Sequence, residues 1–326
     1  MPLATTAHPV QAPATRVLGL RSAVLIAAAL ILLRSAVWVF SESAHFDSDQ
    51  AITGLMAKHL AEGRAFPLFF YGQHYMLAVE AWIAAPLFWL FGASVATLKL
   101  PLLALNLAIA WVLLWVLIRL AGMAPVHALV AVSFFILPTP LVSSRLVEAQ
   151  GGNIEPFLYV LVLWLLRERP VAFGLLAGFA IAHREFSAYA ITAVLAIDAV
   201  SGRAYSGQRM RDYLVAFGAM NVVRVAVELL KSRADLLGPG TAGAVSGSLD
   251  LQFSTVKSFA CWRPAEIASN LRWLAVENLG ALFGWAGQTF AFARDHTLTT
   301  GGSWLGLRWA CRSRCPRLRS PVNGDR

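Results

Sequence analysis

The sequence predicts an all-α protein: a polytopic transmembrane helical bundle with amphipathic surface helices in its first non-cytoplasmic loop. Two observations lead to this prediction. Of the 326 residues, 58% are hydrophobic and only 14% are charged, and the mean hydropathy is +0.62, whereas about a quarter of the residues of a soluble domain are charged. The apolar residues also gather in runs separated by short polar segments, as in proteins with several membrane-spanning helices.

The net charge of +9 comes from 27 Lys and Arg against 18 Asp and Glu. Many of these cations crowd into the last nineteen residues, at positions 308, 312, 314, 317, 319 and 326. The others lie mostly between apolar runs, which is typical of topology determinants, so we expect no nucleic-acid partner. The three cysteines, all late in the chain, indicate neither a disulfide scaffold nor a structural zinc site.

Residues 18–40 form the first predicted span, since this run follows Arg16 and Arg21 and is long enough to cross a bilayer core at about 1.5 Å per residue. A cleaved signal peptide has similar features, but the later apolar runs favour an anchored helix, with residues 1–17 in the cytoplasm. Residues 213–230 contain Arg224 and Glu228 and could form a span or an interfacial helix. Further spans are predicted at 100–118, 128–143, 154–166, 170–182 and 186–200.

Lys and Arg residues between the spans predict the orientation. With the N-terminus inside, eight loop cations before residue 213 lie on the cytoplasmic side and four on the other, if 76–91 does not cross the membrane. The cytoplasmic set is 16, 21, 119, 167, 169, 203, 209 and 211, and the opposite set is 58, 64, 145 and 184. The loops 41–99 and 144–155 then share the non-cytoplasmic side, so we expect two polar loops to meet there.

The first outer loop, 41–99, carries acidic residues next to a predicted amphipathic helix. Apolar residues at 52, 55, 56 and 60 recur at helical spacing, with Ser48 as the expected N-cap and Gly63 as the stop. A carboxylate in the first turn is stabilised in its charged form, so Asp49 could accept a proton. Alternatively, Asp47 and Asp49 only cap the helix. A divalent cation stays optional, because two carboxylates do not complete the shell of a hard cation.

An aromatic segment with Gln73 and His74 follows at 66–81, and it leads into a predicted surface helix that ends at Phe91-Gly92. Aromatic residues at this density commonly form an interfacial belt, which is the alternative to a functional role.

In combination these features resemble the membrane-embedded GT-C glycosyltransferases, in particular the bacterial relatives of protein O-mannosyltransferases and of the aminoarabinose transferase that modifies lipid A. The resemblance covers about residues 18–200 and includes the aromatic-Gly-Gln-x-Tyr order at 71–75. In that family the first outer loop carries an essential acidic residue, often as Asp-Glu before Ala, and Asp49-Gln50-Ala51 stands there in this chain. The next outer loop of the family has an Arg followed by acidic or glycine residues, which matches 145–155.

The resemblance implies a polyprenyl-phosphate-linked sugar as donor and a hydroxyl of a glycan, lipid or protein as acceptor. Asp49, or as second choice Asp47, would deprotonate the acceptor, and a single displacement would invert the sugar. Arg145 would bind the departing phosphate, because a guanidinium can hold phosphate oxygens in a fork. His74 and Arg184 are weaker phosphate candidates; His74 could be merely interfacial, and Arg184 could pair locally. The candidates for acceptor binding, or for support of the catalytic groups, are Gln73, Tyr75 and Glu148.

The end of the chain gives weaker patterns. Residues 231–307 are expected to form an outer loop with one further span near 275–292, and 308–326 a basic tail. Members of the family usually continue with more helices, so we expect a short, truncated or frameshifted form, which could be an inactive glycosyltransferase.

A non-catalytic membrane protein or a lipid-linked-sugar transporter is the alternative class. A transporter would carry polar residues at mid-membrane and an internal repeat, whereas the acidic and aromatic residues here lie in outer loops. The composition, rich in Ala, Leu and Arg, fits a bacterial inner-membrane protein with its active face outward.

Overall fold

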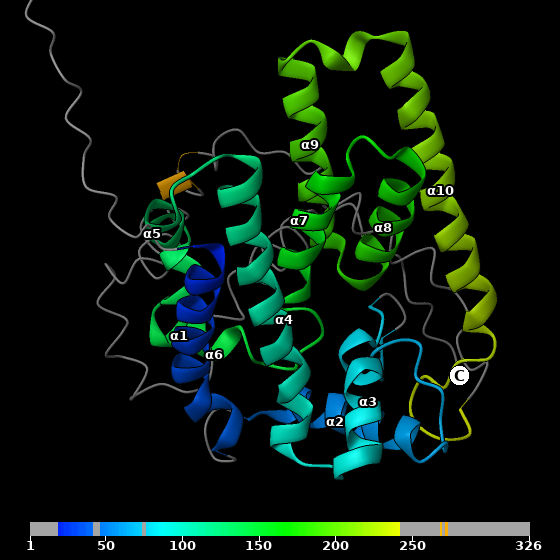
Figure 1. The fold of residues 1–326 in the computed structure, drawn as a ribbon. Helices are drawn as coiled ribbons and strands as arrows, with labels where there is room; N and C mark the ends of the chain where they lie inside the picture. Colours follow the sequence, from blue (N-terminus) through cyan, green and yellow to red (C-terminus); the bar gives the residue numbers. More distant parts are fainter. Residues whose placement is uncertain (1–18, 42–45, 74–75, 242–267, 269–270, 273–326) are drawn as a thin grey trace, which may run out of the picture.

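The computed structural model describes residues 19–41, 46–73, 76–241, 268 and 271–272. Besides one isolated bridge between Phe69 and Leu77, the regular elements in this part of the chain are helices, which confirms the all-α prediction there. In chain order (Figure 1) they are α1 (Leu20–Phe40), α2 (Ser48–Ala61), α3 (Val79–Phe91), α4 (Val95–Trp115), α5 (Pro125–Ile136), α6 (Pro140–Arg145), α7 (Glu155–Leu166), α8 (Pro170–His183), α9 (Ala188–Val200) and α10 (Gly207–Lys231).

Three described helices are long and apolar enough to cross a membrane: α1, α4 with its π-helical extension to Leu120, and α10. The length and composition of these helices support the predicted membrane character. The region 213–230, for which a span and an interfacial helix were both open, belongs to the 25-residue α10 and has the composition of a span. The apolar helices α3, α5, α7 and α8 have 12 to 14 residues and are shorter than the about 20 residues that a span needs.

The prediction of one span over 128–143 is wrong. Helix α5 ends at Ile136, and the six-residue α6 begins at Pro140. Pro138 and Pro140 explain the break, because neither can donate a helical N–H and each restricts the residue before it to extended conformations. Arg145 is thus the last residue of the separate short helix α6.

The predicted helix of the first outer loop exists, but its cap is one residue earlier than expected. Asp47 is the N-cap of α2, with its side chain accepting a hydrogen bond from Gln50 N at 3.0 Å, and Ser48 is the first helical residue. The helix ends at Ala61, shortly before Gly63, whose φ of 65° suits a glycine. Its buried face is partly polar and consists of Gln50, Thr53, Met56, Ala57 and His59.

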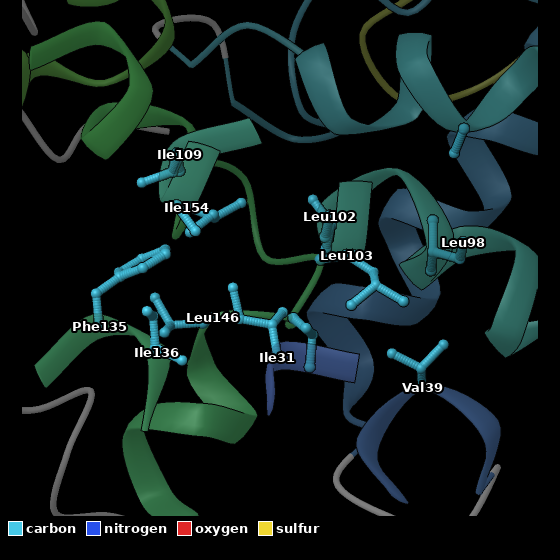
Figure 2. Close-up of a cluster of buried hydrophobic side chains, with 14 of the residues drawn as sticks. Ile31, Val39, Leu98, Leu102, Leu103, Ile109, Phe135, Ile136, Leu146 and Ile154 are labelled. Atoms are coloured by element: carbon cyan, nitrogen blue, oxygen red, sulfur yellow. The ribbon is translucent and has the colours of Figure 1, made fainter. Parts of the chain in front are cut away.

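The main core lies between α1, α4, α5 and the segment from α6 to α7, and Figure 2 shows its apolar side chains. A chain of hydrogen-bonded polar groups crosses this core. Arg34 of α1 donates to Asn106 Oδ1 of α4 at 2.7 Å, and Asn106 Nδ2 donates to the carbonyl oxygen of Leu146 at 2.7 Å. These bonds fix the start of the loop after α6 against α1 and α4.

Helices α8 and α10 pack very closely because α8 presents glycines to its neighbour. A β-carbon built on Gly178 would lie 2.7 Å from the carbonyl oxygen of Met220, and one built on Gly174 would lie still closer to the carbonyl oxygen of Ala216. Only glycine permits this approach of the two backbones.

The helices place two distinct groups of polar residues at opposite ends of the molecule. Figure 1 shows α2 and α3 at one end, and the connection between α9 and α10 at the other. At the second end, Asp198 accepts hydrogen bonds from Arg209 Nε and Nη2 at 2.8 and 2.6 Å, and Arg203 lies 3.1 Å from its other oxygen. The expectations for residues 1–17, for the span near 275–292 and for the basic tail at 308–326 lie outside the described residues.

Candidate functional site

Two polar loops that are about a hundred residues apart in sequence meet at the N-terminus of α2. Gln150 donates through Nε2 to Asp47 Oδ2, and Ala149 N donates to the buried Gln50 Oε1 at 3.4 Å. The expected meeting of the loops 41–99 and 144–155 is therefore present. We call these residues, with Asp49, Arg145, Glu148 and Arg184, the loop junction.

Asp49 is the acidic residue of the loop junction with the freest carboxylate. It lies in the first turn of α2 with an exposed side chain, and its carboxylate accepts no hydrogen bond from the described residues. Asp47 differs, since one oxygen caps α2 and the other accepts from Gln150. A reacting hydroxyl would therefore find an acceptor at Asp49 without displacing an existing bond.

Burial raises the pKa of Asp49, and the carboxylates of Asp47 and Glu148 raise that pKa further. This direction is opposite to the one that the helix N-terminus alone would give. The expectation from the sequence considered only the helix, whereas the fold brings two more carboxylates close to Asp49. Such a shift moves an Asp toward the range in which a general base works best near neutral pH.

Arg145 is tied to Glu148 rather than to α2. Its Nη1 donates to Glu148 Oε2 at 2.6 Å and, over a longer 3.4 Å, to Gln150 Oε1. Glu148 is buried and also accepts from Asn153 Nδ2 at 3.2 Å. An anion at Arg145 would therefore share the guanidinium with the Glu148 carboxylate.

Arg184 approaches the same loop from the end of α8. Its Nη2 donates to the carbonyl oxygen of Gln150 at 3.1 Å, and its buried Nε has no partner among the described residues. The structure thus places Arg145 and Arg184 on either side of Gln150.

The aromatic segment is only partly described. Gln73 lies in a turn, where its N–H donates to the carbonyl oxygen of Phe70 at 2.9 Å, and within the described part its side chain forms no hydrogen bond with Asp47 or Asp49. Next to it, Gly72 N donates to Leu236 O, and Leu77 N donates to Ala182 O. His74 and Tyr75 lie outside the described residues.

The sequence reasoning missed two residues, Gln150 in the loop junction and Lys99 next to it. Gln150 links Asp47, Arg145 and Arg184, and only the tertiary fold reveals this. Lys99 is fully buried in α4, where its Nζ donates to Trp38 O at 3.0 Å and lies within electrostatic range of Glu148 and Asp47. A lysine within an apolar run is a signal that could have identified it, because such residues are costly to bury and often functional.

A second carboxylate, Glu80, lies behind the loop. It belongs to the first turn of α3, is buried, and accepts hydrogen bonds from Gly151 N at 2.5 Å and Gly152 N at 2.6 Å. Burial raises the pKa of Glu80, whereas the two amide bonds and the nearby Arg184 act in the opposite direction.

The described residues contain no group of three or more His, Cys, Asp or Glu side chains arranged to hold a metal ion. The chemistry that the loop junction can support with its own side chains is proton acceptance at Asp49 and anion binding at the two arginines. Neither a protein-family model, nor a curated protein, nor a solved structure matches this chain.

Proposed function

We propose that this protein is a polytopic membrane glycosyltransferase that moves a sugar from a polyprenyl-phosphate donor to an acceptor hydroxyl at the non-cytoplasmic face. The observation that carries this proposal is the loop junction. It combines the pKa-raised carboxylate of Asp49, which accepts no hydrogen bond from the described residues, with two arginines that contact Gln150 of the facing loop. Transfer from a phosphate-linked sugar needs these two functions, a base for the incoming hydroxyl and cations for the leaving phosphate.

In the proposed reaction, Asp49 accepts the proton of the acceptor hydroxyl as its oxygen attacks the anomeric carbon. The bond from that carbon to the phosphate oxygen breaks, and the polyprenyl phosphate leaves with the electron pair. The guanidinium of Arg184, with that of Arg145, stabilises the charge that develops on the phosphate. A single displacement inverts the configuration at the anomeric carbon.

The position of the loop junction is compatible with a lipid-linked donor. Asp47 and Glu148 lie within electrostatic range of Lys99 near the start of α4, and Lys99 donates to Trp38 O near the end of α1. A polyprenyl chain in the bilayer would therefore present its phosphate at the height of this site.

Purified protein in liposomes, supplied with labelled polyprenyl-phosphate sugars and a panel of hydroxyl acceptors, tests the donor class. We expect label to move to an acceptor from a lipid-phosphate donor and not from the matching nucleotide sugar. Transfer from the nucleotide sugar alone, or from neither donor with the protein correctly inserted, would reject the proposal.

One observation favours a second candidate, a transporter of lipid-linked sugars. Glu155 at the start of α7 and His183 at the end of α8 are both buried. Neither the carboxylate oxygens of Glu155 nor Nε2 of His183 has a hydrogen-bond partner in the described part of the chain. Buried ionisable groups at the ends of short helices also occur along transport pathways. Uptake of labelled lipid-linked sugar into the inner leaflet of liposomes, without any transfer to acceptors, would support this candidate.

A further inference from the structure

Glu80 stands out because the rest of α3 is apolar. It is the only charged residue between Val79 and Phe91, and only 2% of it is exposed. Its two oxygens each accept one backbone N–H, Oε2 from Gly151 and Oε1 from Gly152. A buried carboxylate is costly, and short bonds of this kind to amide groups repay the cost.

The loop is built to receive this carboxylate. Gly151 and Gly152 have φ values of 79° and 98°, a region that residues with a β-carbon rarely adopt. A β-carbon on Gly152 would also lie 2.6 Å from Arg184 Cγ, and one on Gly151 would lie 2.6 Å from Met76 Cε. These successive glycines turn two neighbouring N–H groups toward Glu80.

The residue just before this pair is Gln150, the centre of the loop junction. Its side chain donates to Asp47 and its carbonyl oxygen accepts from Arg184. The carboxylate of α3 therefore fixes the backbone from which Gln150 reaches the N-terminus of α2.

We propose that Glu80 is a positioning residue of the transfer site: by binding Gly151 and Gly152 it holds Gln150 on Asp47 and keeps Arg184 on the same loop. Glu80 itself touches neither donor nor acceptor. This inference rests on the proposed glycosyl transfer, and it assigns to α3 the task of setting the distance between the base and the phosphate-binding arginines.

The first test measures the position of the loop without any transfer reaction. Cysteines at Gln50 and Ala149, in a chain whose natural Cys261, Cys311 and Cys315 are replaced by serine, should crosslink with a short thiol reagent in membranes. We expect Glu80→Gln to slow this crosslinking about tenfold, the effect of losing one hydrogen bond to a charged group. Failure of the parent chain to crosslink would overturn the inference.

The control is Glu62→Gln, which removes a carboxylate at the C-terminal end of α2 whose ion-pair partners are Lys58 and Arg64, away from the loop junction. It should crosslink at the parent rate. Glu80→Asp, which keeps two acceptor oxygens on a shorter stem, should give an intermediate rate, and it serves as the second variant if Glu80→Gln does not fold.

The second test is kinetic. Glu80→Gln should lower kcat about 10- to 100-fold per folded molecule, with the KM for the donor changed less than about twofold, because misplacement of groups on the reacting side affects the transition state most. Glu80→Asp should recover part of the kcat. An active parent together with unchanged crosslinking and kcat in Glu80→Gln would overturn this inference alone. An inactive parent whose crosslinking depends on Glu80 would count against the proposed function alone.

Discussion

At the scale of single residues, Asp47 and Asp49 differ in whether their carboxylate oxygens already accept hydrogen bonds from the described residues. Asp47 uses one oxygen for the cap and the other for Gln150, whereas Asp49 keeps its carboxylate open. The sequence ranked Asp49 before Asp47 only through the family resemblance, since the two residues stand two positions apart at the start of the same helix. The fold therefore supplies the argument for Asp49 as the base.

The pH dependence of transfer should report this residue. A base acts when it is ionised, so activity is present above the pKa of Asp49 and is lost as the pH falls through it. Because burial, Asp47 and Glu148 raise this pKa, we expect the acidic limb at a higher pH than the ordinary pKa of an Asp, about 3.9, would give. Glu148→Gln removes one of the negative charges that raise the pKa of Asp49, so the acidic limb of the pH–activity profile should move to lower pH. A limb that shifts upward in this variant would contradict the assignment.

The two arginines should act on the donor rather than on the acceptor. Arg145→Ala and Arg184→Ala each remove a charged donor, and we expect the KM for the polyprenyl-phosphate sugar to rise about 10- to 100-fold. Arg119→Ala, at the other end of α4, is the control and should leave this KM unchanged. Steady-state kinetics over a donor series measures the effect, and equal donor dependence in all three variants would refute the phosphate-binding role.

Much of the loop junction could be read from the sequence, but its connections could not. The sequence predicted that Asp47, Asp49, Arg145 and Glu148 lie on the same side, because the cation count predicted one orientation of the spans. It did not identify Gln150, since an amide in a loop carries no pattern of its own, and its role depends on which residues the fold brings to it.

At the scale of elements, helices with strong local signals were predicted well and their ends less well. The spacing of the apolar residues and the glycine after them correctly predicted helix α2. The predicted N-cap was Ser48 and the observed one is Asp47, because both residue types are common N-caps and only the backbone conformation distinguishes them. The prediction of one span over 128–143 is wrong, because it relied on the apolar composition of this run. In the structure, Pro138 and Pro140 divide the run into the two helices α5 and α6.

The close contact of α8 and α10 gives a prediction at this scale. Gly178→Ala should destabilise the protein by about 1–3 kcal/mol, because its new β-carbon meets the backbone of α10. Gly218→Ala is the matched control, since nothing lies within 4 Å of a β-carbon there, and it should be neutral or stabilising by up to about 1 kcal/mol. Thermal unfolding in detergent measures both, and equal melting temperatures would show that the helices are not packed this closely.

At the scale of the whole molecule, the separation of α2 and α3 from the connection between α9 and α10 predicts a topology (Figure 1). The expected cytoplasmic end carries Arg203 and Arg209, and the loop junction lies at the other. In a cysteine-free chain within bacterial spheroplasts, Glu62→Cys should react with an impermeant maleimide and Ser201→Cys only after permeabilisation. The reverse pattern would place the loop junction in the cytoplasm.

The central claim is that the loop junction transfers sugar with Asp49 as its base, and the most direct measurement compares the unaltered chain with Asp49→Asn. Both are inserted in liposomes with a labelled polyprenyl-phosphate sugar and its acceptor. We expect transfer by the unaltered chain and loss of transfer in Asp49→Asn with unchanged insertion, because the substitution keeps the shape and removes the proton acceptor. Transfer that persists in Asp49→Asn and is lost in Asp47→Asn would contradict this claim and assign the base to Asp47.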